Sequence, residues 1–194
     1  MFCFLVQSSV NVGKSSVVHR LKTLMRKKGF DIKGVDVSNF RAAMRALFDH
    51  FETVNPQIKE VINKQSWELS YQEMKQQGSV FTKIIKDNVE HRFSQNGKSV
   101  VFHGPCINLE EFAGSDFPDK HLVKIFLDID PTEHAKRIHS QTRQSTDKLE
   151  QFENIRDQHN QFKIDAANAN ALILRADKKA HRKIYKHICM ASVK

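Results

Sequence analysis

The feature that most constrains this chain is a polar loop placed between an apolar run and an amphipathic helix pattern. Residues 2–7 form an apolar run of the kind found in buried parallel strands. Residues 8–15 read Ser-Ser-Val-Asn-Val-Gly-Lys-Ser, and apolar side chains then recur every three or four positions from residue 14 to residue 28. Gly29 is expected to end this helix. A strand, a loop and a helix in this order predict the first unit of a parallel α/β sheet.

The same alternation continues along the chain. Further strands are expected at residues 32–37, 98–103, 121–129 and 171–174. Helices are expected at residues 40–51, 58–93 with a break near Gly78, 131–141, 147–164 and 177–189. The pattern predicts an α/β fold with a five-stranded parallel sheet flanked by helices. The chain has 194 residues and no Pro- or Gly-rich linker, so we expect a single domain.

The loop after the first strand carries a phosphate-binding pattern. Gly13, Lys14 and Ser15 match the end of the P-loop motif, and Ser8 stands where its first glycine belongs. Such a loop holds phosphates with backbone N–H groups, a lysine and a helix N-terminus, while the hydroxyl binds Mg²⁺. The alternative is an ordinary strand–helix loop. We expect ATP and Mg²⁺ to bind here, with Lys14 exposed and Ser15 as a metal ligand. The predicted nucleotide-binding residues are Ser8, Ser9, Val10, Asn11, Val12, Gly13, Lys14, Ser15 and Ser16.

Polar residues at other strand ends are candidates for chemistry, because ligands of parallel sheets lie at the carboxyl ends of the strands. Asp36 is placed to order a Mg²⁺-bound water or to accept a proton from an acceptor hydroxyl, with helix capping as the alternative. Arg41 is a candidate ligand for an acceptor phosphate, or else a surface arginine. His103 either contacts the acceptor or is a satisfied core histidine. Trp67 and Tyr71 are expected in the core rather than on a base.

The charge is strongly basic and uneven. The formal net charge is +9, with basic segments at residues 20–33 and 175–194. Solvated helix faces are the first interpretation, and attraction of anionic substrates or nucleic acid is the second. The C-terminal helix is expected to be structural, and no nucleic-acid motif accompanies its charge, so we do not expect a nucleic-acid partner. Its predicted apolar stripe is Ala180, Ile184, Ile188 and Ala191.

The cysteines and the apolar runs of the sequence indicate the cellular compartment. Three widely spaced cysteines favour reduced thiols and a cytoplasmic protein, and no apolar run is long enough to predict a membrane span. We therefore expect no membrane partner.

The chain resembles the cytidylate kinases, within the nucleoside-monophosphate kinases. The resemblance covers most of its length and rests on residues 8–15, 37–41, 98–104, 124–137 and 155–157. It implies a P-loop kinase domain with a helical acceptor-binding region at about 40–94 and a lid at about 138–148. The arginines that would close over the transferring phosphate are Arg137, Arg143 and Arg156, with solvated surface positions as the alternative. Adenylylsulfate kinases are similar in the loop and at Asp36, Asn39 and Arg41.

Several positions depart from the cytidylate kinase pattern. Pro105 and Cys106 stand where the family has Arg-Asp, and Asn160 and Lys163 stand where it grips cytosine. The nucleotide end of the site is therefore expected to be kept and the base-reading end to be altered. Three functions stay open: a phosphotransferase for a nucleoside monophosphate or another small metabolite, a degenerate nucleotide-binding protein, and a nucleic-acid-binding protein.

Overall fold

The first strand lies at the centre of the sheet and is buried along its whole length. In the computed structural model, β1 (Cys3–Gln7) pairs in parallel with β3 (Ser99–Gly104) on one side and with β4 (Leu122–Asp128) on the other. β2 (Ile32–Asp36) and β5 (Leu172–Arg175) extend the two edges, so the strand order is β2-β3-β1-β4-β5. The predicted five-stranded parallel sheet is confirmed. The structure describes residues 2–37, 69–79, 82, 99–112, 122–141 and 148–191.

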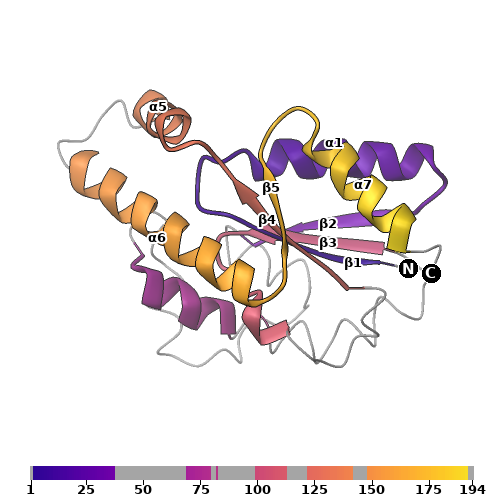
Figure 1. Cartoon of the computed structure of the whole chain (residues 1–194), viewed down its shortest axis with the longest axis horizontal. Helices are drawn as coiled ribbons and strands as arrows, with labels where there is room; N and C mark the ends of the chain where they lie inside the picture. Colours follow the sequence, from indigo (N-terminus) through magenta and orange to yellow (C-terminus); the bar gives the residue numbers. More distant parts are fainter. Residues whose placement is uncertain are drawn as a thin grey trace, which may run out of the picture.

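Helices cover both faces of the sheet, as Figure 1 shows. α1 (Lys14–Lys27) and α7 (Ala180–Ala191) lie together on one face, and α6 (Lys148–Asn168) lies on the other with a helical segment at 71–79. α5 (Pro131–Gln141) follows β4 at the carboxyl end of the sheet. Each face has its own buried apolar cluster. Burial on both faces explains why the strands read as continuous apolar runs.

Two helices differ from their predicted ends. α6 continues to Asn168 instead of stopping at residue 164, because Ala166 is buried and Asp165 accepts a hydrogen bond from the Tyr71 hydroxyl at 2.6 Å. α7 begins at Ala180 instead of residue 177. Asp177 forms a turn before the helix, where its carboxylate accepts the backbone N–H of Lys179 at 2.7 Å.

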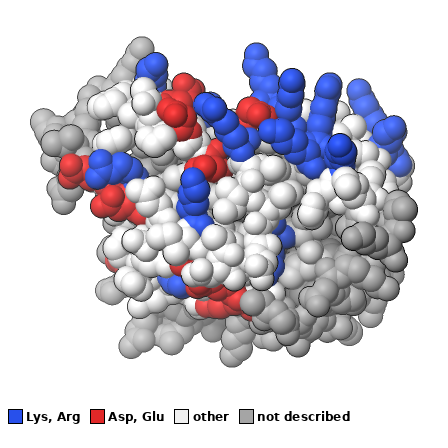
Figure 2. Space-filling model, in the orientation of Figure 1, with Lys and Arg blue, Asp and Glu red and all other residues white. Residues whose placement is uncertain are grey.

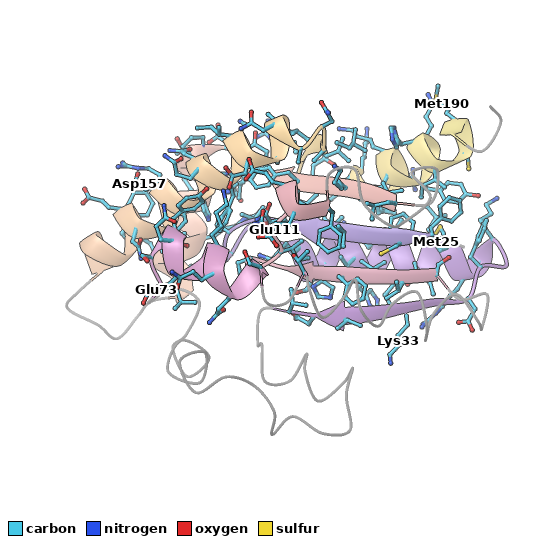
Figure 3. The ribbon with its side chains drawn as sticks, turned by 90° about the horizontal axis from the view of Figure 1, so that it is seen from below. Met25, Lys33, Glu73, Glu111, Asp157 and Met190 are labelled. Atoms are coloured by element: carbon cyan, nitrogen blue, oxygen red, sulfur yellow. The ribbon has the colours of Figure 1, made fainter. Side chains whose placement is uncertain are left out.

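The helical segment 71–79 packs beside α6 and the short 3₁₀ helix η1 (Glu110–Phe112), as Figure 3 shows through Glu73, Asp157 and Glu111. The Tyr71 ring lies 5.2 Å from the Phe162 ring, which confirms its expected place against the core. Lys75 donates to Glu110 at 2.8 Å. Gly78 is itself helical within the described segment 71–79, and a Cβ there would lie 2.7 Å from the Cys106 carbonyl oxygen, so the glycine permits close packing.

Some predicted features lie outside the described residues. They include the helix at 40–51, most of the helix at 58–93, and Trp67. The single-domain organisation, the acceptor-binding region at 40–94 and the lid at 138–148 therefore stay predictions. Within the described residues, no helix is both long and apolar enough to cross a membrane. Cys3, Cys106 and Cys189 are free thiols.

The packing of α7 gives a first prediction. Ala180, Ile184 and Ile188 are buried against the α1 side of the sheet, which confirms the predicted stripe at these positions. We expect Ile184→Ala to lower the free energy of unfolding by about 2–5 kcal/mol, because it leaves a cavity in a closed core. The exposed neighbour Arg182→Ala should change it by less than about 0.5 kcal/mol. Urea unfolding followed by circular dichroism measures both, and equal small effects would show that α7 is not part of the core.

Candidate nucleotide site

The loop between β1 and α1 has the backbone geometry of a tight anion-binding turn. Gly13 is the N-cap of α1 and has a φ of 105°, in the left-handed region that favours glycine. A Cβ at Gly13 would lie 3.2 Å from Arg137 Nη1, so this position also permits a close approach. Asn11 has a φ of 61°, a conformation that asparagine tolerates. Ser8 is not among the described residues with positive φ, so a side chain in place of the motif's first glycine costs no backbone strain.

The N-terminus of α1 has neither a side-chain cap nor an acidic residue in its first turn. The first N–H groups of a helix have no partner within the helix, and the helix dipole makes this end positive. Ser15 and Ser16 lie exposed in the same turn. Most helices satisfy these donors with a Ser, Thr, Asp or Asn cap. An uncapped end with exposed hydroxyls therefore fits a bound phosphate.

Lys14 is buried inside the loop. Its side chain is directed at two loop carbonyls, and Nζ donates to Ser8 O at 2.9 Å and to Ser9 O at 2.5 Å. The expectation that Lys14 is exposed is wrong, because only 8% of the residue is accessible to solvent. Burial lowers the pKa of Lys14 to about 8, and the nearby Asp36 charge opposes this shift. An anion in the loop would stabilise the ammonium form.

Asp36 and His103 meet at the carboxyl ends of the neighbouring strands β2 and β3. His103 Nδ1 lies 3.8 Å from Asp36 Oδ1, and no described residue offers this buried nitrogen a hydrogen bond. Burial lowers the pKa of His103, and the positive charge of Lys14 adds to the effect. The Asp36 side chain is 50% exposed. The structure thus brings together Lys14, Asp36 and His103, three of the predicted site residues.

Arg137 of α5 borders the loop on its other side. Its Nη1 donates to Val12 O at 2.7 Å, and its Nε donates to Glu133 at 2.9 Å. A cavity of 520 Å³ opens here, large enough for the nucleoside part of a nucleotide. It runs from the phosphate loop to the turn after β5. Its lining includes Gly13, Ser16, Arg20, Arg137, Arg175 and Lys178.

Two buried histidines contact the loop between β1 and α1, and sequence reasoning missed both. His159 of α6 lies between Ser9 and Asp128, with Nδ1 3.0 Å from Ser9 Oγ and Nε2 3.0 Å from Asp128 Oδ1. His134 Nε2 lies 2.9 Å from Val10 O, and the two imidazole rings are 5.3 Å apart. The chain has ten histidines, and no spacing marks these two. We call His134 and His159 the histidine pair.

The acceptors determine the tautomers of the histidine pair. The Val10 carbonyl only accepts, so His134 donates from Nε2. The Asp128 carboxylate likewise accepts a hydrogen bond from the Nε2–H of His159. The unprotonated Nδ1 of His159 then accepts a hydrogen bond from the Ser9 hydroxyl. Burial lowers the pKa of both histidines. Burial raises the pKa of Asp128, but hydrogen bonds from Lys163 and His159 outweigh it and lower the pKa overall.

The other predicted residues are placed differently. Arg156 lies 6.0 Å above the Phe152 ring and 3.5 Å from Asp157, and its side chain is 48% exposed. Arg156 lines a second cavity of 320 Å³ with Asn160 and the histidine pair. Lys14 does not line this cavity, so the structure does not place Arg156 with Lys14. Lys163 donates to Asp128 at 2.7 Å. Arg41 and Arg143 lie outside the described residues.

Cys106 is a buried free thiol shortly after the end of β3. Its Sγ donates to Gln77 Oε1 at 3.1 Å, and burial raises its pKa to about 12. A thiol with this pKa is not a nucleophile at neutral pH. The described residues contain no group of three or more His, Cys, Asp or Glu that would hold a metal ion alone. A Mg²⁺ that uses phosphate oxygens and water as further ligands suits the exposed Ser15 hydroxyl.

Comparison with known proteins finds no matching family model and no matching curated protein. Among solved structures, the chain is similar to the shikimate kinase of Bacteroides thetaiotaomicron, with 14% sequence identity and a TM-score of 0.49 over 100% of this chain and 99% of that chain. It is also similar to the shikimate kinase of Aquifex aeolicus, with 16% identity and a TM-score of 0.44 over 99% and 97% of the two chains. Both TM-scores lie below 0.5, so neither similarity carries an inference about the activity of this chain.

The histidine pair predicts a pH dependence of stability. Both histidines have a pKa below the usual 6.5 in the folded state, so at and below pH 6.5 the unfolded chain binds more protons. The stability that the two neutral histidines contribute to the folded state is therefore complete above about pH 6.5 and is lost as the pH falls. Each imidazole contributes a slope of up to about 1.4 kcal/mol per pH unit.

Urea unfolding between pH 5 and pH 8 measures this slope. The double variant His134→Gln/His159→Gln should have a shallower slope than the parent, and His103, whose pKa burial also lowers, accounts for part of the slope that remains. A slope unchanged in the double variant would assign the pH dependence to other groups.

Proposed function

We propose that this chain is an ATP-dependent phosphotransferase that transfers the γ-phosphoryl group of ATP to a small acceptor. The observation that carries the proposal is the uncapped N-terminus of α1 with the Lys14 ammonium buried beside it. The helix end has no side-chain cap, the buried cation has only carbonyl oxygens as described hydrogen-bond partners, and a polyphosphate would add negative charge to both. The position of this loop at the carboxyl end of the central strand supports the same function.

At the nucleotide end, the loop N–H groups would bind the β-phosphate, and Lys14 would reach the β- and γ-phosphates from the floor of the loop. The Ser15 hydroxyl would hold Mg²⁺, which neutralises phosphate charge when bound. The nucleoside would occupy the 520 Å³ cavity, beside Arg137 and the turn after β5. Arg137 already lies against Gly13, close to where the phosphates would pass.

At the acceptor end, Asp36 is placed to take the proton of an acceptor hydroxyl or to orient a metal-bound water. His103, neutral at pH 7 because its pKa is lowered, would orient the same acceptor. Arg41, Arg143 and Arg156 are proposed to neutralise the acceptor and transferring phosphates. Catalysis then consists mainly of positioning and charge stabilisation, as in other phosphoryl transfers.

Within this function, a nucleoside monophosphate is the proposed acceptor class, in the manner of the cytidylate kinases that the sequence resembles. The alternative acceptor is another small hydroxylated metabolite. A second candidate function is nucleotide sensing without turnover, which the neutral Pro105-Cys106 pair and the buried thiol of Cys106 favour. A reduced cytoplasm suits the three free thiols.

The nucleotide end is tested by ligand-induced stabilisation. We expect ATP with Mg²⁺ at a hundredfold excess over Kd to add about 2.7 kcal/mol, or roughly 5–10 °C in Tm. Lys14→Ala should fold but lose this shift, because the charge partner of the phosphates is gone. Lys22→Ala, on the same helix but half-exposed, is the matched control and should keep it. No shift with ATP or GTP at millimolar concentration would disprove the phosphate-loop assignment.

The acceptor end is tested by turnover. ATP consumption should be screened across nucleoside monophosphates and small hydroxylated metabolites. We expect CMP to be a poor acceptor, because Asn160 and Lys163 replace residues of the cytidylate kinase pattern. Asp36→Asn should lower turnover of the best acceptor at least about a hundredfold and keep the ATP-induced Tm shift.

Two results would change this assignment. Efficient, cytosine-selective phosphorylation of CMP would show that the replaced positions do not read the base. ATP binding without turnover of any acceptor would favour the nucleotide-sensing function.

A further inference from the structure

The two basic segments of the chain come together on one face of the molecule. α1 and α7 lie side by side on the same side of the sheet (Figure 1), and neither helix contains an aspartate or a glutamate. Both point their apolar stripes inward, as the burial of Leu21 and Ile184 shows. Their polar sides therefore form a common outer surface. In Figure 2, Lys and Arg side chains project from the edge of the molecule where Figure 1 draws these helices.

This surface carries almost no negative charge. Within α1, α7 and the turn before α7, the one carboxylate is Asp177, which accepts hydrogen bonds from the Lys179 N–H at 2.7 Å and from Lys183 Nζ at 3.4 Å. We call the surface the α1–α7 basic face, and define it by its exposed cations. They are Arg20, Lys27, Lys178, Lys179, Arg182, Lys183 and Lys186.

Cations from both helices lie close enough to one histidine to affect its pKa. His181, in the first turn of α7, has a lowered pKa, first because of burial and then because of the charges of Arg182 and Arg20. One of these arginines belongs to α7 and the other to α1. The sequence places the two segments about 150 positions apart and favours two separate solvated faces. The fold instead brings the two segments together on one side of the sheet (Figure 1).

The arrangement is unfavourable for the chain alone. Along α7 and the turn before it, Lys178, Arg182 and Lys186 follow each other at four-residue intervals, as do Lys179 and Lys183. Arg182 and Lys186 both lie within α7, where like charges four residues apart destabilise the helix. Helix surfaces without a charged partner ordinarily mix both signs. The repulsion is relieved when a polyanion lies across the face.

The chemistry of the face favours nucleic acid over a membrane. A membrane-binding helix presents large apolar side chains beside its basic residues. Here the apolar residues of α7 are used in the core, and the large exposed apolar residue described on this helix is Met190, near its end. Phosphodiester backbones need only positive charge at suitable spacing. Helices of 14 and 12 residues span about 20 Å, a length over which a duplex carries about a dozen phosphates on its two strands together.

We propose that the α1–α7 basic face binds the phosphate backbone of nucleic acid without reading its sequence. Lysine and arginine side chains on two convex helices contact phosphates, and base recognition would need side chains directed into a groove. Arg20 and Lys178 also line the 520 Å³ cavity, so the face begins at the rim of the candidate nucleotide site. The binding does not depend on phosphoryl transfer.

The test is a fluorescence-anisotropy titration of the full chain with a labelled 20-base-pair duplex and a labelled single strand, each of scrambled sequence. We expect micromolar Kd values at 50 mM salt, equal among sequences. If about five cations contact phosphates, log Kobs should fall with log salt with a slope of about −4.5.

The diagnostic variant is Lys179→Gln/Arg182→Gln/Lys183→Gln, which should weaken binding at least tenfold and reduce the slope by about 3. Its Tm should stay the same or rise, because like-charge pairs are removed. The matched control, Lys33→Gln/Lys124→Gln/Lys136→Gln, removes the same charge elsewhere and should bind within twofold of the parent. Lys14→Ala should also bind like the parent, which separates this face from the phosphate loop.

Three outcomes would overturn the proposal. The first is the absence of binding at 50 mM salt, and the second is an equal loss in both triple variants, which would mean attraction by net charge alone. The third is tighter binding to phosphatidylserine vesicles than to nucleic acid, together with a triple variant that weakens binding to the vesicles but not to nucleic acid. That result would make the face a membrane-binding surface.

Discussion

The buried ammonium group of Lys14 is the interaction on which the candidate site depends. Nζ lies at the positive end of α1 and is held by the Ser8 and Ser9 carbonyls, with no carboxylate among its described hydrogen-bond partners. Desolvation and the helix dipole both disfavour a cation at this point. An anion bound in the loop would therefore stabilise the ammonium group. Gly13, the uncapped helix end and the exposed hydroxyls of Ser15 and Ser16 fit such an anion.

The loop keeps this unfavourable geometry because helices far away in sequence hold it. His159 fixes Ser9 through its hydroxyl, and His134 fixes Val10 through its carbonyl. The two histidines belong to α6 and α5, the helices on either side of the predicted lid. A change in the position of these helices would therefore act directly on the loop backbone. The neutral state of the histidine pair, which burial favours, is what allows Ser9 to donate to His159.

α1 serves three functions with three parts of its surface. Its N-terminus belongs to the proposed anion site, its apolar stripe packs on the sheet, and its outer side joins α7 in the basic face. These uses do not conflict, because a helix separates its end, inner face and outer face in space. The arrangement also places Arg20 where the basic face meets the nucleotide cavity. Electrostatic attraction of ATP and of nucleic acid would consequently share one positive field.

The sequence by itself determined the parallel α/β fold, the phosphate loop and the candidate residues at the strand ends. These features are local: apolar runs, helical spacing and the Gly13-Lys14-Ser15 pattern are each contained within a few residues. Only the tertiary structure decided the burial of Lys14, the histidine pair and the single basic face. Each of these depends on elements that are distant in the chain, such as Ser9 and His159. Spacing along a sequence carries no signal for such contacts, because they arise from how helices pack on the sheet.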